Sequence, residues 1–189
     1  IWIGGYFLLN AKHIDKKIVQ LAVFAFAFSW VGDVLLIFGE KQFIFFVLGL
    51  ASFLVAQLGY IFLFRRTIIL SGKKPFLKKK PYLLIAYIAF GLVVYTILYN
   101  QLDAILRMAV FVYMVALLGM SSMALNCFGN GHPVSFSYIF IGSLLFVLSD
   151  TLIAINKFLV PIPYEGVLIM TTYICAQYLI MRGLLKQYV

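Results

Sequence analysis

Residues 18–38 read IVQLAVFAFAFSWVGDVLLIF, and residues 134–155 read VSFSYIFIGSLLFVLSDTLIAI. Each stretch is long enough to cross a bilayer as a helix, because a span needs about 20 apolar residues. Each also carries one acid, Asp33 or Asp150, five residues before its end. A charged side chain at the bilayer centre costs about 2.5–3.5 kcal/mol on insertion scales, so intramembrane acids are rare and mark functional sites. The two stretches therefore point to both the fold and a site.

The whole chain has the composition of an integral membrane protein. Hydrophobic residues make up 65% of its 189 residues and charged residues 11%, whereas soluble domains hold about 45–50% and roughly 25%. The mean hydropathy is +1.07. We predict an all-α fold, a polytopic transmembrane helical bundle that forms one integral-membrane domain over residues 1–189. The six expected spans are residues 18–38, 43–64, 82–99, 104–126, 134–155 and 166–185.

The first nine residues form a further apolar run that is too short to span a membrane. We expect this run to be the second half of a helix whose first half precedes residue 1. A signal peptide is the alternative, but the run lacks a basic segment before it and a small-residue cleavage site after it.

Positive charge lies mainly on one side of the predicted bundle. When the loops are assigned alternately to the two sides, twelve Lys and Arg fall on one side and three, Lys41, Arg107 and Lys157, on the other. The positive-inside rule then predicts a cytoplasmic C-terminus. The basic segment 65–80 could suggest a nucleic-acid partner, but such runs beside a membrane usually contact anionic lipid headgroups. We expect membrane lipids as partners and no nucleic acid.

In this topology the two acids lie at a similar depth. Both of their helices run from the cytoplasmic to the outer side, and five residues at 1.5 Å each place both acids about 7–8 Å inside the outer boundary. We predict that Asp33 and Asp150 share one cavity, with their carboxyls about 4–10 Å apart, the range over which paired carboxylates cooperate. The alternative is two separate structural acids, each satisfied by its neighbours.

Other polar residues recur at helical spacing within the spans, as expected for helices around a polar pocket. Ser29 precedes Asp33 by one turn, and Lys157 follows Asp150 by two turns, where it could meet a lipid phosphate. The alternatives are hydrogen bonds between helices and, for Lys157, a side chain that only reaches the headgroups. The candidate substrate-binding or supporting residues are Ser29, Gln57, Tyr60, Tyr113, Ser149, Asn156, Lys157, Tyr173 and Gln177.

Several chemistries lack the residues they need. His13 and His132 both fall in cytoplasmic-side loops, away in depth from the two acids. Neither a zinc site nor a Ser-His-Asp triad can be assembled at that level. We therefore expect neither a metal nor another cofactor.

Three stretches resemble a known family. The segments are FSWVGDVLL (28–36), LFVLSDTLIAINKF (145–158) and MTTYICAQYLI (170–180). They are similar to sequences of the YhhN family, the bacterial and animal lysoplasmalogenases. The resemblance implies eight transmembrane helices in a complete protein, of which this chain would hold six and part of another. We expect an integral protein of a bacterial inner membrane.

The sequence departs from the family pattern at one position. Where the family commonly has a His followed three residues later by a Tyr, this chain has Gln57 and Tyr60. An acid–base role of that His therefore does not carry over, whereas a hydrogen-bonding role does.

The activity that the resemblance implies is hydrolysis of the vinyl-ether bond of a lysophospholipid, a lysoplasmalogen, to a fatty aldehyde and a glycerophospho-choline or -ethanolamine. Protonation of a vinyl ether at carbon gives an oxocarbenium ion that water captures, and Asp33 and Asp150 would supply the acid and the carboxylate. Alternative functions are a proton-coupled transporter and a non-catalytic binder of a small lipid or polar solute. The sequence specifies no oligomeric state.

Overall fold

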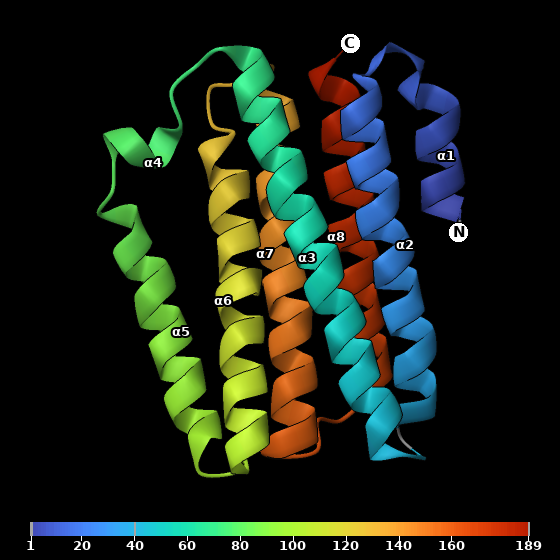
Figure 1. The fold of residues 1–189 in the computed structure, drawn as a ribbon, viewed down its shortest axis with the longest axis vertical. Coiled ribbons are helices and arrows are strands. Elements are labelled where there is room, and N and C mark those ends of the chain that lie inside the picture. The colour runs from blue at the N-terminus through green and yellow to red at the C-terminus, as the bar shows by residue number, and fades with distance from the viewer. Residues whose placement is uncertain (1, 40, 189) are drawn as a thin grey trace.

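The computed structural model describes residues 2–39 and 41–188, which fold as an upright bundle of helices (Figure 1). A short helix and a 3-10 turn (Ala11–His13) come first, and a four-residue helix, α4, links the two halves of the chain. The helices are α1 (Trp2–Asn10), α2 (Lys16–Gly39), α3 (Phe43–Ser71), α4 (Phe76–Lys79), α5 (Leu83–Tyr99), α6 (Ala104–Asn126), α7 (Pro133–Phe158) and α8 (Glu165–Gln187).

The helices confirm the predicted bundle class. Five of them, α2, α3, α6, α7 and α8, are long and apolar enough to cross a membrane. The sixth predicted span is α5, whose 17 residues rise only about 26 Å, short of a hydrocarbon core of about 30 Å. Helix α6 begins and ends at the predicted residues.

Two helices run further than the apolar segments that predicted them. Helix α3 continues past residue 64 to Ser71, so Arg65 and Arg66 lie inside the helix and not in the loop to which the sequence assigned them. The helix ends only at Gly72, whose φ of 66° gives the left-handed cap that glycine adopts without strain. Helix α7 extends to Phe158 and therefore includes Asn156 and Lys157. Apolar runs under-estimate such helices because cationic ends reach the membrane interface without breaking the helix.

Adjacent antiparallel helices approach closely where glycine leaves room. In the α7–α8 pair, a Cβ at Gly183 would lie 2.6 Å from the Ile139 side chain and 2.9 Å from the Ser135 carbonyl oxygen. In the α2–α3 pair, a Cβ at Gly32 would lie 2.7 Å from the Phe53 ring. Small residues at such crossings let the backbones pack within the membrane. The residue beside Asp33 is thus fixed by its packing against α3.

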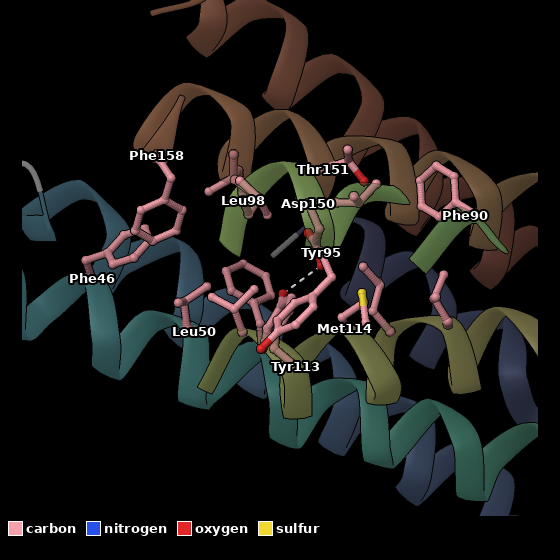
Figure 2. Close-up of a pocket in the computed structure, with 17 residues that line it drawn as sticks. Phe46, Leu50, Phe90, Tyr95, Leu98, Tyr113, Met114, Asp150, Thr151 and Phe158 are labelled. Atoms are coloured by element: carbon pink, nitrogen blue, oxygen red, sulfur yellow. Dashed lines mark hydrogen bonds between the residues drawn. The ribbon is translucent and has the colours of Figure 1, made fainter. Parts of the chain in front are cut away.

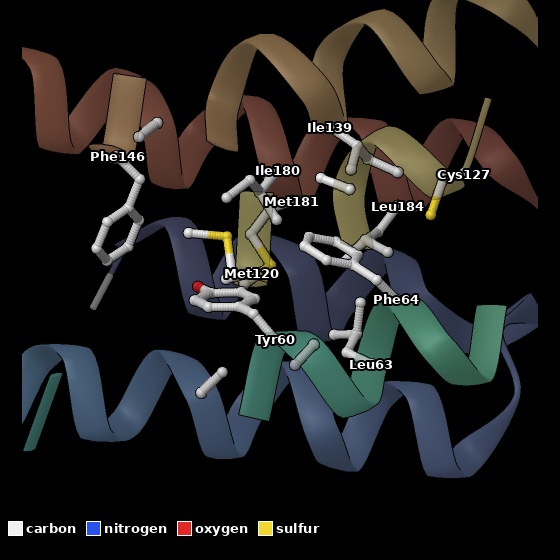
Figure 3. Close-up of a cluster of buried hydrophobic side chains, with 14 of the residues drawn as sticks. Tyr60, Leu63, Phe64, Met120, Cys127, Ile139, Phe146, Ile180, Met181 and Leu184 are labelled. Atoms are coloured by element: carbon white, nitrogen blue, oxygen red, sulfur yellow. The ribbon is translucent and has the colours of Figure 1, made fainter. Parts of the chain in front are cut away.

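A buried hydrophobic cluster fills the bundle between α3, α6, α7 and α8 (Figure 3). Its largest fully buried side chains include Tyr60, Phe64, Met120, Phe146 and Ile180. Helix α5 contributes little to this core, since its buried residues are Gly91 and Leu98. It lies at one edge of the bundle, next to α6 (Figure 1).

Candidate functional site

Asp150 is the buried acid of the bundle, with 6% of its surface exposed. Its Oδ2 atom accepts two hydrogen bonds, from Gln57 Nε2 at 3.0 Å and from Tyr113 Oη at 2.6 Å. Gln57 comes from α3 and Tyr113 from α6, so two helices hold one oxygen of an α7 carboxyl. Buried carboxyls are tolerated when polar partners surround them in this way.

The Asp150 carboxyl lines a small cavity between α3, α5, α6 and α7, called the Asp150 cavity below. Its volume is about 60 Å³, which is enough for water or for a few atoms of a substrate. Figure 2 shows Phe46 and Phe158 at one end, Phe90 at the other, and the bonded pair of Asp150 and Tyr113 between them. The rest of the lining is predominantly aliphatic and aromatic.

A second polar group connects α2, α3 and α8. Tyr60 Oη donates to Gln177 Oε1 at 2.5 Å, and Gln177 Nε2 donates to Tyr173 Oη at 3.2 Å. The Tyr173 hydroxyl lies beside the carboxyl of Asp33, which is half-buried on α2. Tyr60, Gln177 and Tyr173 therefore form one hydrogen-bonded chain inside the bundle, with Asp33 beside its Tyr173 end.

The two polar groups are neighbours, separated in part by an aromatic ring. Phe53 lines the Asp150 cavity and packs edge-on against the Tyr173 ring, with ring centroids 5.9 Å apart. Asp33 is not among the residues that line this cavity. A cavity shared by both acids stays a prediction.

Two buried polar atoms near the acids have no hydrogen-bond partner within residues 2–39 and 41–188. They are Ser29 Oγ and Gln57 Oε1, from residues that are 1% and 0% exposed. An unpaired buried polar atom costs about 1–3 kcal/mol, so such atoms usually meet a water or a ligand. Gln57 thus has its Nε2 on Asp150, while its Oε1 has no partner among the described residues.

The remaining predicted residues lie at the edge of the site or support the backbone. Ser149 Oγ donates to the Ile169 carbonyl at 3.1 Å, and Asn156 Oδ1 accepts from the Ile162 backbone N–H at 2.8 Å. Both contacts tie α7 to the segment that follows it. Lys157 is exposed, with Nζ 5.0 Å from the centroid of the Phe46 ring. It therefore lies at the Phe46 end of the Asp150 cavity.

No metal-ligand cluster is found in the described part of the chain, where no three His, Cys, Asp or Glu side chains come together. His132 instead caps α7, with Nδ1 accepting from the Val134 N–H at 3.2 Å. Asp15, at the start of α2, pairs with Arg66 at 3.2 Å. Hydrogen bonds from Arg66 lower the pKa of Asp15, which gives this acid a structural role.

The sequence did not reveal the apolar residues that shape the Asp150 cavity. Only Asp150 and Tyr113 among the predicted site residues line it. Inside a membrane, core-facing and lipid-facing surfaces are both apolar, so hydrophobic periodicity does not separate them. The apolar lining residues that the sequence did not single out include Phe46, Phe53, Phe90, Leu118 and Phe158.

Comparisons with known proteins match nearly the whole chain. The sequence model of the YhhN family matches residues 4–184. Lysoplasmalogenase TMEM86A of Bos taurus is 34% identical over 180 residues, which cover 94% of this chain and 68% of that protein. Lysoplasmalogenase TMEM86A of Homo sapiens is 35% identical over 156 residues, or 81% of this chain and 60% of that protein.

A second kind of relative matches to a similar extent. Lysoplasmalogenase TMEM86B of Sus scrofa is 34% identical over 152 residues, which cover 80% of this chain and 58% of that protein. The chain thus spans between about 58% and 68% of the length of these relatives. No solved structure matches.

Proposed function

Because the chain belongs to the YhhN family, we propose that it is a membrane hydrolase that cleaves the vinyl-ether bond of lysoplasmalogens. The products are a fatty aldehyde and a glycerophospho-choline or -ethanolamine. The observation that supports this proposal most directly is the carboxyl of Asp150, which lines an apolar cavity and is held by Tyr113 and Gln57. A proton donor in a water-poor cavity suits an ether that reacts by protonation at carbon.

The reaction begins with a proton transfer to carbon and consumes one water. The acid gives its proton to the outer carbon of the C=C bond, and the electron pair of that bond forms the new C–H bond. The ether oxygen shares its charge with the neighbouring carbon as an oxocarbenium ion, which a carboxylate stabilises as in glycosidases. Water adds to that carbon while a carboxylate takes its proton. The hemiacetal then breaks its C–O bond to the glycerol oxygen: its hydroxyl loses a proton to form the aldehyde, and the departing glycerol oxygen gains a proton to become a hydroxyl.

We assign the direct role to Asp150 and the role of second carboxyl to Asp33. Gln57 and Tyr113 fix the orientation of Asp150, and the unpaired Oε1 of Gln57 is placed to accept a hydrogen bond from water. Ser29, Tyr60, Tyr173 and Gln177 support Asp33. For Asp33 to reach the same substrate, the Phe53 ring that packs on Tyr173 has to move.

The lipid headgroup is assigned to the Phe46 end of the Asp150 cavity, where Lys157 is exposed. Eleven ångströms or so of helix separate the Lys157 and Asp150 positions, at about 1.5 Å per residue. That length suits a phosphate that lies a few bonds from the vinyl ether. With a cytoplasmic C-terminus in a bacterial inner membrane, this end faces the outer leaflet.

Aldehyde release by the purified protein tests the proposal. In detergent, with EDTA present throughout, the protein should convert a synthetic lysoplasmalogen into fatty aldehyde and a water-soluble glycerophosphodiester. The same lipid with a saturated ether should not react, because it has no C=C bond to protonate. Failure to release aldehyde, or release that depends on an added divalent ion, would contradict the proposal. Proton-coupled lipid movement without cleavage would favour a transporter.

A further inference from the structure

The Asp150 cavity is too small for the lipid that the proposed function requires. Its volume of about 60 Å³ holds the reacting atoms, whereas sites for whole small molecules measure about 300–1,000 Å³. Most of a single-chain lipid must therefore lie outside it. The following inference rests on the proposed function and concerns the place of the hydrocarbon chain.

A larger groove continues from the Asp150 cavity between α5, α6 and α7. Its volume is about 460 Å³. Three residues line both spaces, one from each helix: Phe90 of α5, Leu118 of α6 and Thr151 of α7. Figure 2 shows Phe90 and Thr151 on the side of the cavity opposite Phe46. The groove therefore begins at the end of the cavity that lies away from Lys157.

The polar side chains in this groove are already satisfied. Thr151 Oγ1 donates to the Val147 carbonyl at 2.7 Å, within its own helix. Tyr87 Oη donates to the Ser121 carbonyl at 3.3 Å. The other lining side chains are all aliphatic or phenylalanine, among them Leu83, Leu125, Phe140, Leu144 and Leu148. Such a surface offers no free hydrogen-bonding side chain to a polar ligand and suits a hydrocarbon chain.

The groove also has the length and direction of a lipid chain. On α7 its lining runs from Thr151 through Leu148 and Leu144 to Phe140, a stripe at helical spacing. Eleven residues of helix measure about 16 Å. Because each C–C bond of about 1.5 Å advances a zigzag chain by only about 1.3 Å, an extended chain of roughly 14 carbons has that length. The stripe leads from the acid toward the end of the bundle opposite Lys157.

We propose that the groove between α5, α6 and α7 binds the hydrocarbon chain of the lysoplasmalogen and determines the chain length that the protein accepts. Leu144 and Leu148 are partly exposed at the groove. The chain therefore enters sideways from the bilayer, between α5 and α7, while the headgroup stays near Lys157. In this arrangement the vinyl-ether bond lies at Phe90 and Thr151, next to Asp150.

Blocking the groove tests this proposal. Leu144→Trp fills the groove about two turns beyond Thr151, so chains of 16–18 carbons should lose activity at least fivefold while chains of eight carbons keep it. The matched control is Ile141→Trp, on the same helix. Ile141 is 48% exposed against 43% for Leu144 and does not line the groove. An unchanged chain-length profile in Leu144→Trp would overturn the groove assignment and leave the proposed hydrolase intact.

Photocrosslinking separates the groove from the reaction itself. A lysophospholipid with a diazirine at the chain end should label residues around Leu83, Leu125 and Phe140 in the wild-type protein, whether or not turnover occurs. Excess unlabelled lysophospholipid should compete, and excess diacyl phospholipid should not. Labelling spread over all lipid-facing helices, or removed equally by diacyl lipid, would show only bulk lipid there and would overturn the proposal. Groove labelling without aldehyde release would contradict the proposed function alone.

Discussion

Helices α3 and α5 both line the Asp150 cavity, but they are packed very differently. Twelve residues of α3 are buried, among them Gln57 and Tyr60, whereas α5 buries Gly91 and Leu98. Helix α3 holds the Asp150 carboxyl through the hydrogen bond from Gln57. Helix α5 contributes apolar side chains such as Phe90 and Leu98 to the cavity lining. Lipid-exposed helices with few buried contacts are the ones that move most readily.

From this difference we infer that α3 and α5 have different roles at the cavity. The reacting carboxyl needs a fixed position within about 0.5 Å, which a well-packed helix and its hydrogen bonds provide. In the proposed function a lipid substrate also needs a side that opens to the bilayer, and we assign this side to α5. Changes on the packed side should therefore impair the chemistry or the stability, whereas changes at the rim of the cavity should impair only binding.

The largest expected effect concerns the two acids on the packed side. Asp33→Asn and Asp150→Asn should each reduce turnover at least about 100-fold, because general acid–base roles contribute 10²–10⁴-fold. The amide keeps the volume and hydrogen bonding, so expression and thermal stability should hold. Aldehyde release under saturating substrate is the measurement.

Asp103→Asn provides the matched control for these two variants. Asp103 is exposed and caps α6, with Oδ1 accepting from the Ile105 and Leu106 N–H groups at 2.9 and 2.8 Å. Asn caps helices about as well as Asp, so this variant should keep wild-type activity. An Asp33 or Asp150 variant that retains more than about a tenth of the rate would remove that residue from the mechanism.

A smaller effect is expected at the hydroxyl that holds Asp150. Tyr113→Phe removes the 2.6 Å hydrogen bond to Oδ2 and should lower kcat at least about tenfold, because this bond strengthens as Asp150 gives up its proton and a bond to a charged group contributes about 1.5–3 kcal/mol. The Gln57 bond keeps the carboxyl in place, so activity should fall and not vanish. Tyr138→Phe, also a half-buried tyrosine, is the control. Equal rates in the two variants would mean that Tyr113 only packs.

A change at the rim should affect binding alone. Lys157→Ala should raise KM for the phospholipid several-fold, because it removes the cation that is assigned to bind the phosphate. It should change kcat little, because the position of Asp150 does not depend on Lys157. Lys41→Ala, another exposed lysine on the side poor in cations, should keep the wild-type KM. If Lys157→Ala keeps both constants, its contact with Phe46 is its whole role.

The smallest expected effect is on stability, at the closest helix crossing. Gly183→Ala places a methyl 2.6 Å from the Ile139 side chain, and such overpacking costs about 1–3 kcal/mol. The melting temperature should fall by about 2–10 °C in a chain of this size. At Gly166, on the same helix, a Cβ meets nothing within 4 Å, so Gly166→Ala should melt like the wild type. Equal melting temperatures of the two variants would show that the α7–α8 crossing accommodates a methyl at residue 183 without loss of stability.

The sequence predicted the features that depend on polarity and length. Apolar runs located every long helix within a few residues, except that α3 reaches Ser71 because arginines do not stop a helix. The two rare acids identified the polar interior, and Gln57 and Tyr113 proved to be bonded to one of them. Polar residues carry this information because an unpaired polar group in a membrane has to find a partner.

The sequence could not assign roles that depend on how a helix is rotated about its own axis. Asn156 and Ser149 looked like members of the site, yet both bond to backbone atoms of the segment after α7. The groove residues Leu144 and Leu148 carry no polar group that would have singled them out in the sequence. In both cases the deciding information is the rotation of α7, which a uniformly apolar helix does not encode in its pattern.

Hydrolysis in heavy water tests the central claim most directly, because that claim is proton transfer from a carboxyl to carbon. Wild-type protein should release an aldehyde that carries one deuterium on the carbon next to the aldehyde group, and Asp150→Asn should release almost none of it. The mass spectrum of the aldehyde gives both results from one lysoplasmalogen. Aldehyde without deuterium, or equal amounts of deuterated aldehyde from the wild type and Asp150→Asn, would contradict the account.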